Sequence, residues 1–289
     1  MQHIPVLQDE IIKLLAPQPN DNFIDLTLGH GGHSAMILEK TAPKGKLLAF
    51  DQDPVAFDQA KKNLARFGNR VTFFQTNFTE IGLIIRKWPV TQVNGILIDL
   101  GPNTDQLTDE ERGFSFRANA KLDMRMDPTR QRVTAADIVN KYSIAEITTI
   151  LFAGEEHFAK PIARQIIKNR PLETTDQLVA IIKTAIPPSY RFKQKTHFAT
   201  ATFRALRMAV NNELDNLEKV LPQAVSILSP GGRMGIISFH SLEDRIVKNF
   251  LRCRADLNIL TPKPVVSSQK EIETNPSARS AKLRGATKI

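Results

Sequence analysis

The stretch Phe23-Ile24-Asp25-Leu26-Thr27-Leu28-Gly29-His30-Gly31-Gly32-His33-Ser34 decides the fold class of this chain. It contains a short apolar run, a glycine-rich turn and a helix start in that order. Glycines let the backbone approach a ligand closely, and the free N–H groups of a helix start can face that ligand. The same pattern is equally typical of a tight turn with no ligand. The stretch therefore predicts a strand, a turn and a helix, and it leaves the ligand open.

Around this stretch, short apolar runs alternate with polar, helix-compatible segments. The runs are Phe23 to Leu28, Lys46 to Phe50, Val71 to Gln75 and Gly95 to Leu100. Strands that alternate with helices are typical of a parallel sheet with crossover connections. A further apolar run, Met234 to Phe239, follows a Ser-Pro-Gly-Gly turn and indicates that the α/β pattern resumes late in the chain.

The middle of the chain has a different character. Residues 107–199 contain no convincing strand, whereas Ser143 to Glu146 and Thr174 to Gln177 have the spacing of helix capping boxes. We therefore expect an α/β core over 1–106 and 200–260, interrupted by an inserted helical subdomain over 107–199. Apolar residues on one face predict a long amphipathic helix that includes Phe203, Leu206, Val210, Leu214 and Leu217.

Residues 261–289 are polar and rich in cations, which predicts a mobile basic tail. The cations are Lys263, Lys270, Arg279, Lys282, Arg284 and Lys288.

Charge and composition narrow the class of protein. The formal net charge is +9 over 289 residues and the sequence pI is about 9.7, which favours contact with a polyanion. Cys253 is the single cysteine, so no intramolecular disulfide or cysteine-based metal cluster can form. No His/Asp cluster has metal-ligand spacing, and no apolar run approaches the roughly 20 residues that span a bilayer. We expect a cytoplasmic protein without a metal and without membrane contact.

Carboxylates at strand ends bear on the cofactor. Asp51 follows the glycine turn by about 20 residues, where an acidic side chain accepts hydrogen bonds from ribose hydroxyls. A dinucleotide site would have a third glycine at Ser34, and Asp25 would crowd a pyrophosphate. Asp25 suits a ligand that bears an ammonium group and a sulfonium, which favours S-adenosylmethionine. Phe78 follows the third predicted strand and lies either beside the adenine or in the core. Asp99 ends the fourth predicted strand, where ligands of open α/β sheets bind.

At this point the chain resembles the MraW (RsmH) ribosomal RNA cytosine-N4 methyltransferases of bacteria, nearly from end to end. The matching strings include His3-Ile4-Pro5-Val6-Leu7, Gly31-Gly32-His33-Ser34, Asp51-Gln52-Asp53-Pro54, Asp99-Leu100-Gly101, Gln106-Leu107, Glu111 to Phe116, Leu122 to Asp127, Gly154-Glu155-Glu156, Val210 to Leu214, Ser238 to Arg245 and Asn275 to Ser280. So many strings in one order make a chance match negligible.

The resemblance implies an α/β, Rossmann-like fold of the class I S-adenosylmethionine-dependent methyltransferases with a helical insertion. It implies that the substrate is a cytosine in the decoding centre of small-subunit ribosomal RNA, presented as free RNA or in the assembled 30S subunit, and it leaves a homodimer open. It also implies cofactor contacts, which fall on Gly31, Gly32, His33, Asp51, Phe78, Asp99 and Gln106.

Two stretches depart from the family pattern. Where the family reads Asp-Leu-Gly-Val-Ser-Ser-Pro-Gln-Leu-Asp, this chain has Pro102-Asn103-Thr104-Asp105 between Gly101 and Gln106. Where the family reads His-Pro-Ala-Thr-Arg-Thr-Phe-Gln, this chain replaces the arginine by Ala201 and gains Arg204. The departures predict a changed loop beside the methyl group and shifted RNA contacts.

Candidate catalytic residues follow from the chemistry of the substrate. A cytosine amino nitrogen shares its lone pair with the ring, so an acceptor that localises this pair and takes up developing positive charge helps methyl transfer. Asp99 is the first candidate, either in this role or as a cofactor contact. His240 follows a predicted strand, where it would bind the target nucleotide or accept a proton. The alternative is that His240 is a structural hydrogen-bonding residue.

Candidate substrate contacts lie in the inserted subdomain. The candidates are two arginines that would bind phosphate, Arg112 and Arg125, and two aromatic residues that would stack on an unpaired base, Phe114 and Phe116. The alternative is that Asp123, Arg125 and Asp127 form a local ion-pair network that fixes the loop. Three other functions remain as alternatives. The protein would be an assembly factor or sensor that binds S-adenosylmethionine or RNA without turnover, a nicotinamide oxidoreductase, or a methyltransferase that acts on a small molecule or on DNA.

Overall fold

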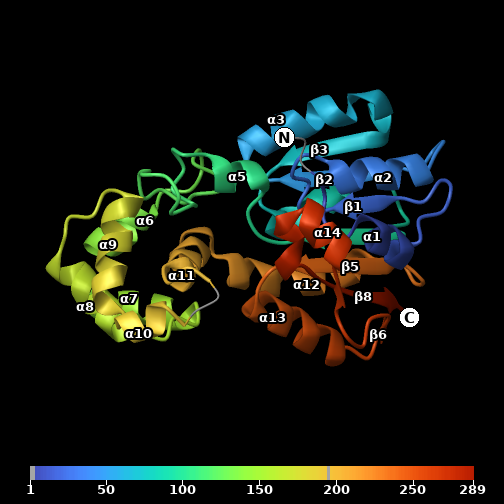
Figure 1. The fold of residues 1–289 in the computed structure, drawn as a ribbon. Coiled ribbons are helices and arrows are strands. Elements are labelled where there is room, and N and C mark those ends of the chain that lie inside the picture. The colour runs from blue at the N-terminus through green and yellow to red at the C-terminus, as the bar shows by residue number, and fades with distance from the viewer. Residues whose placement is uncertain (1–3, 194–195) are drawn as a thin grey trace. The chain divides into compact units, whose positions relative to one another are not determined.

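The computed structural model describes residues 4–193 and 196–289, and it divides the chain into two compact units (Figure 1). Unit 1 consists of Met1–Gly101 and Leu214–Ile289, and unit 2 consists of Pro102–Glu213. The inserted unit thus begins at Pro102, where 107 was expected, and ends at Glu213, where 199 was expected. In the described residues no helix is long and apolar enough to cross a membrane.

Unit 1 is built on one eight-stranded sheet with the order β3-β2-β1-β4-β5-β8-β6, in which β7 also pairs with β8. The strands β1 to β5 are parallel, and β8 is antiparallel to its neighbours. The strand bounds are β1 Phe23–Asp25, β2 Leu47–Asp51, β3 Val71–Gln75, β4 Gly95–Asp99, β5 Arg233–Ser238, β6 Leu257–Ile259, β7 Val265–Val266 and β8 Lys282–Lys288. The predicted Rossmann-like α/β fold is confirmed.

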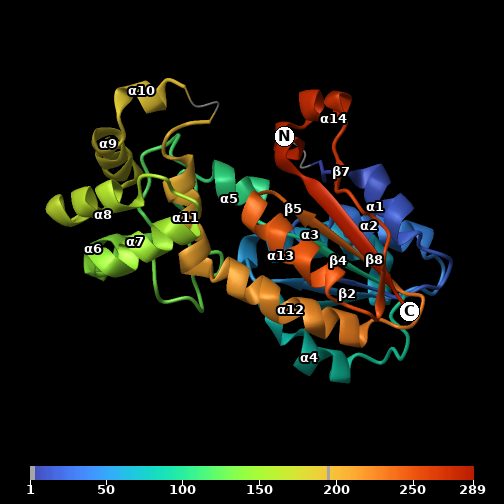
Figure 2. The same ribbon diagram turned by 90° about the horizontal axis from the view of Figure 1, so that it is seen from below.

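Helices cover both faces of this sheet (Figure 2), because side chains in a strand alternate between its faces. On one face Leu47 and Leu97 pack with α1 (Gln8–Leu15), α2 (Gly32–Lys40) and α3 (Pro54–Leu64). On the other face Leu48 and Ile96 pack with α4 (Ile81–Ile84), α12 (Glu213–Ile227) and α13 (Ser241–Arg252). Shorter elements are η1 (Ala65–Arg70), η2 (Phe78–Glu80), η3 (Ile85–Lys87), α14 (Gln269–Thr274) and η4 (Pro276–Ser280).

The expectation of a mobile basic tail over 261–289 is wrong. Its last residues form β8, which pairs with β5 from Arg233↔Thr287 to Ser238↔Lys282. Leu283 and Ala286 are fully buried, and the Arg284 guanidinium binds Asp244 at 2.6 Å. The two apolar side chains of this strand, Leu283 and Ala286, are three residues apart, and Arg284 and Gly285 between them are buried as well. The segment therefore lacks the two-residue period of a half-buried strand, and its sequence did not signal the strand.

Unit 2 is helical, as predicted. Its helices are α5 (Thr104–Thr108), α6 (Ala135–Lys141), α7 (Ile144–Ala153), α8 (Ala159–Lys168), α9 (Thr175–Ala185), α10 (Pro188–Arg191) and α11 (Thr200–Asn211). Both expected capping boxes are present, at Ser143 with Glu146 and at Thr174 with Gln177. They satisfy backbone N–H groups that would otherwise lack partners at the helix starts.

The single long helix predicted around residues 203–217 is two helices. Asn212 has a φ of 50° in the left-handed region and ends α11, and α12 begins at the next residue. Phe203 and Leu206 lie in the core of unit 2, whereas Leu217 lies in the core of unit 1. An apolar stripe that continues through the break therefore serves two separate cores.

Candidate active site

Three carboxylates end neighbouring parallel strands of unit 1. Asp25 ends β1, Asp51 ends β2 and Asp99 ends β4. β1 pairs with β2 on one side and with β4 on the other, so the chain changes direction across the sheet at β1 and β4. Ligands of open α/β sheets bind at such a switch point, outside the carboxyl ends of the strands. These three aspartates therefore mark the candidate active site.

The glycine turn between β1 and α2 has the predicted conformation. Gly29 has a φ of 52° and Gly31 a φ of 81°, both in the left-handed region that favours glycine. A Cβ added to Gly29 would meet no atom within 4 Å, so open space adjoins the backbone there. A Cβ on Gly32 would lie 2.2 Å from Cγ of Pro5, so this glycine is required for packing. The turn thus leaves room for a ligand at Gly29.

Asp51 ties the end of β2 to this turn. Its Oδ2 accepts a hydrogen bond from the Gly29 N–H at 2.7 Å, and its Oδ1 accepts one from the Asp53 N–H at 2.8 Å. Burial raises the pKa of Asp51 to about 7, although these two hydrogen bonds oppose the shift. The carboxylate is therefore held rigidly at the strand end, and its remaining lone pairs suit the ribose hydroxyls expected there.

Asp25 has an internal role that the sequence did not reveal. It is buried, with 1% of its surface exposed, and its Oδ2 accepts a hydrogen bond from the Ser34 hydroxyl at 2.6 Å. Its Oδ1 accepts a hydrogen bond from the Thr27 N–H. Burial raises the pKa of Asp25 to about 6. Ser34, which stands where a dinucleotide motif would have its third glycine, thus joins the start of α2 to the end of β1.

Asp99 is the carboxylate best placed for chemistry. Its N–H donates to the Thr27 hydroxyl at 2.5 Å, which fixes the end of β4 against the chain after β1. Its Oδ1 is buried and accepts no hydrogen bond from the described residues, and its Oδ2 lies 3.7 Å from His33 Nε2. Burial, followed by the nearby charges of Asp25 and Glu243, raises the pKa of Asp99 to about 8. An acceptor without a donor in a low-dielectric setting is suited to a cationic ligand.

These observations fit S-adenosylmethionine better than a dinucleotide. Burial is the main cause of the raised pKa values of Asp51 and Asp99, and the negative charge of Asp25 adds to both shifts, so Asp25 repels each of the other two carboxylates. A ligand with ammonium and sulfonium charges relieves that repulsion, whereas a pyrophosphate would increase it. Gly29, Asp51 and Asp99 are the residues that would hold such a cofactor. Among them, the buried Oδ1 of Asp99 is a hydrogen-bond acceptor with no donor in the described residues.

Phe78 lies in η2, directly after β3, and is half-buried against the core of unit 1. The side chain of Asn77 caps this turn by accepting from the Thr79 N–H, and its Nδ2 donates to Gln52 Oε1 at 2.8 Å. The ends of β2 and β3 are thereby joined next to the aromatic ring. Phe78 packs on the core and lies at the carboxyl edge, so its contact with the adenine stays a prediction.

His240 caps helix α13. Its Nδ1 accepts from the Glu243 N–H at 3.4 Å, while Glu243 Oε2 accepts from the His240 and Phe239 N–H groups. The His240 Nε2 lies 3.2 Å from Glu243 Oε1. This reciprocal capping box gives His240 the structural role that was the alternative to catalysis. The spacing of His240 and Glu243 is that of a capping box, but histidine is not among the usual capping residues, so the sequence did not signal it.

Gln106 belongs to unit 2, and its expected contact with the cofactor stays a prediction. It is buried in α5, where its side chain accepts from the Asn103 N–H while Asn103 accepts from the Gln106 N–H. The two residues form a capping box. The loop that departs from the family pattern, Pro102 to Asp105, therefore has a clear local structure, because its asparagine starts a helix.

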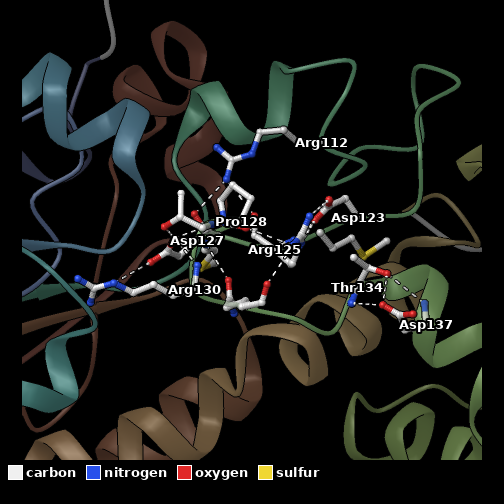
Figure 3. Close-up of polar contacts among 12 residues, drawn as sticks. Arg112, Asp123, Arg125, Asp127, Pro128, Arg130, Thr134 and Asp137 are labelled. Carbon is white, nitrogen blue, oxygen red and sulfur yellow. Dashed lines mark hydrogen bonds and ion pairs between the residues drawn. The ribbon is translucent and has the colours of Figure 1, made fainter.

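The candidate RNA-binding cations of unit 2 are engaged inside it (Figure 3). Arg125 forms a bidentate ion pair with Asp123, at 2.8 and 2.7 Å, and donates to the carbonyl of Gln131 at 2.9 Å. Arg112 donates to the carbonyls of Arg125 and Met126. The ion pair lowers the pKa of Asp123 against the opposing effect of burial. The local network that was the alternative reading is present for Arg125, and it fixes the loop.

The two aromatic candidates of unit 2 differ in environment. Phe114 is buried, with 6% of its surface exposed, and the Arg112 guanidinium lies 5.4 Å from its ring centroid. Phe116 is half-buried and stacks on His197 at 4.5 Å between ring centroids, with Phe203 edge-on at 5.3 Å. Phe114 is therefore a packing residue in this structure. Stacking of Phe116 on a base stays a prediction.

Two further residues of unit 2 hold its loops. The side chain of Asn211, at the end of α11, accepts from the Met126 N–H and donates to the Met124 carbonyl, both at 2.8 Å. Arg204, gained relative to the family pattern, donates to the Gly154 carbonyl at 2.9 Å. A Cβ on Gly154 would lie 2.3 Å from that of Ala205, so α7 and α11 approach closely there. The new arginine thus serves the helix packing of unit 2.

Comparison with known proteins agrees with this geometry. The model of the MraW methylase family matches residues 1–289. Relatives named ribosomal RNA small subunit methyltransferase H include those of Heliobacterium modesticaldum (46% identical, covering 99% of this chain and 98% of the relative), Trichormus variabilis (47%, 99% and 92%) and Thermosipho melanesiensis (46%, 100% and 98%). With this match over its whole length, the chain belongs to the MraW methylase family, and its cofactor is S-adenosylmethionine.

Proposed function

We propose that this protein methylates the N4 amine of a cytosine in the decoding centre of small-subunit ribosomal RNA, in the cytoplasm. The support for RNA as the substrate is that near-full-length relatives at 45 to 47% identity are named for the ribosomal RNA of the small subunit. The observation that carries the amine chemistry is Asp99, whose buried Oδ1 lacks a donor at the switch point of the sheet. The substrate is the free RNA or the assembled subunit.

The cofactor supplies an electrophilic methyl group, and the protein supplies position and electrostatics. Asp99 accepts a hydrogen bond from the amine and disperses the positive charge that develops on nitrogen. The Thr27 hydroxyl, which accepts from the Asp99 N–H, keeps the strand end in place. Asp51 holds the glycine turn through the Gly29 N–H and accepts from the cofactor's ribose. In this proposal Asp51 contributes to cofactor affinity alone, whereas Asp99 faces the cofactor's positive charge and also stabilises the transition state.

The substitution Asp99→Asn tests the proposed role of Asp99. It keeps the shape of the side chain and removes its negative charge, so the transition state suffers more than the bound substrate. We expect the single-turnover rate at saturating S-adenosylmethionine to fall about 10² to 10³-fold, the typical effect of losing one preorganised electrostatic contact. A rate within about threefold of wild type, under 1 kcal/mol in barrier, would exclude Asp99 from the chemical step.

Mass mapping of methylated nucleotides tests the reaction itself. Small-subunit ribosomal RNA from cells with and without this gene is digested, and the modified cytosine is located. We expect one N4-methylcytosine that disappears with the gene and returns with the wild-type protein. RNA binding with no modified nucleotide would instead establish a non-catalytic assembly factor.

A further inference from the structure

The charges of unit 2 are divided unevenly along its sequence. Residues 102–156 contain seven Lys and Arg against ten Asp and Glu. Residues 157–211 contain ten Lys and Arg against two acids, Glu173 and Asp176. Such an asymmetry within one compact unit indicates that its second half is adapted to a polyanion.

Some of these cations are used for folding. The Arg170 Nε donates to the Val139 carbonyl, and Arg207 forms a bidentate pair with Glu213 at 2.8 Å in both hydrogen bonds. Together with Arg204, these arginines hold unit 2 together. Arg191 lies over the Phe198 ring, 5.8 Å from its centroid. Among the described residues, Lys160, Arg164 and Lys168 of α8 are exposed cations that are not used in these ways.

Helix α8 carries three such cations on one face. Lys160, Arg164 and Lys168 are spaced four residues apart, so they project from successive turns about 6 Å apart along the axis. All three are exposed, and within the described residues none of them has an ion pair or a side-chain hydrogen bond. The opposite face of α8 includes Ile162 and Ile166, both fully buried. The helix therefore has a packed face and an exposed face that carries three cations and no acidic residue.

An exposed aromatic residue follows the short helix that contacts the start of α8. Phe192, at the end of α10, has 87% of its surface exposed and stands between Arg191 and Lys193 in sequence. Two residues earlier, Tyr190 packs edge-on against Phe158 at 4.7 Å between ring centroids. Phe158 immediately precedes α8, so this contact brings α10 against the helix start.

We propose that the α8–α10 surface, formed by Lys160, Arg164, Lys168, Phe192 and Lys193, binds single-stranded RNA. Phe192 stacks on an unpaired base, and the cations contact the phosphates that follow along the strand. A membrane does not fit, because the apolar face of α8 is already buried in unit 2 and one aromatic ring provides little insertion. The inference deepens the proposed function and rests on its RNA substrate.

A fluorescence measurement tests the stacking. The protein contains one tryptophan, Trp88, which is 5% exposed, so Phe192→Trp adds a second indole in a nearly fully exposed position. We expect an unstructured RNA oligonucleotide to quench its fluorescence saturably. The matched control is Phe152→Trp, on α7 in the acidic half of unit 2, where the native ring is 51% exposed. No quenching is expected there. Poly-glutamate, a polyanion without bases, should quench neither variant.

Binding measurements test the cations. Phe192→Ala should weaken binding of the oligonucleotide about tenfold, within the range of one lost base–aromatic stack. Replacing Lys160, Arg164 and Lys168 by glutamine together should lower the slope of log K against log salt by about 2, at roughly 0.7 for each phosphate contact to a single strand. Phe152→Ala should change neither quantity.

Three results would overturn the proposal. They are equal quenching at positions 192 and 152, quenching of Phe192→Trp by poly-glutamate as strong as by RNA, and an unchanged salt slope in the triple variant. The proposed function is judged separately by methylation with the wild-type protein. Intact methylation together with any of these three results rejects the surface alone, whereas quenching specific to position 192 with no methylated cytosine rejects the reaction alone.

Discussion

The three aspartates at the sheet edge are the residues whose ionisation controls the site. Burial raises the pKa of Asp51 to about 7 and of Asp99 to about 8, from 3.8. A group with a raised folded pKa stabilises the fold fully below its unfolded pKa, and this contribution is lost as pH rises through the folded value. The ligand-free protein should therefore lose stability progressively between about pH 4 and 8 and lose little more above pH 8, which melting temperatures measured from pH 4 to 9 would show.

The same titration predicts how cofactor affinity depends on pH. The sulfonium of S-adenosylmethionine gains more from ionised aspartates than does S-adenosylhomocysteine, which has no sulfonium. The ratio of the two affinities should shift toward S-adenosylmethionine as pH rises from 6 to 8.5, as measured by titration calorimetry. In Asp99→Asn this shift should become smaller. A ratio that is the same at both pH values would contradict the electrostatic account of the site.

Asp51 allows a second test at the scale of one residue. Asp51→Ala removes the charge and the acceptors of the Gly29 and Asp53 N–H groups. Charge-assisted hydrogen bonds contribute roughly 1.5 to 3 kcal/mol each, so affinity for S-adenosylmethionine should fall at least tenfold. Circular dichroism serves as the control for folding. A folded variant with wild-type affinity would remove Asp51 from the cofactor site.

Among the elements, β8 shows how a basic segment serves the fold. The Arg284 side chain binds Asp244 of α13, and the Lys288 Nζ donates to the Leu228 carbonyl at 2.6 Å near the end of α12. Truncation after Leu260 would remove β7 and β8 and leave β5 without its antiparallel neighbour. We expect this truncation to abolish cooperative unfolding and cofactor binding together, which calorimetry would detect. A truncated protein that melts as wild type would contradict the placement of β8.

The control for that truncation keeps the strand. Lys263, Lys270 and Arg279 are exposed members of the same segment and lie outside β8. Their joint replacement by glutamine should leave the melting temperature close to wild type. Any change in the salt dependence of RNA binding then reports on phosphate contacts of these three cations, separate from folding.

At the scale of the whole molecule, the two units have separate cores. Ile162 is fully buried in unit 2, and Ile162→Ala should destabilise that unit by about 2 to 5 kcal/mol. Because the three aspartates lie in unit 1, we expect affinity for S-adenosylmethionine at 25 °C to stay within threefold of wild type. Calorimetric scans should show the lowest-temperature transition moving down. A tenfold loss of affinity in the folded variant would mean that cofactor binding depends on the core of unit 2, which carries the contact predicted for Gln106.

The sequence by itself determined the parallel α/β core, the glycine turn, the helical insertion and the aspartates at the strand ends. Apolar periodicity, glycine and capping spacing are local properties, and consecutive parallel strands bring their carboxyl ends to one edge. Tertiary structure alone decided that residues 282–288 enter the sheet and that Arg125 and His240 are held by Asp123 and Glu243. The pairing of β5 with β8 joins segments more than 40 residues apart. Only the folded chain brings charged side chains within hydrogen-bond distance of their internal partners. These internal partners decide which cations and carboxylates can interact with a ligand.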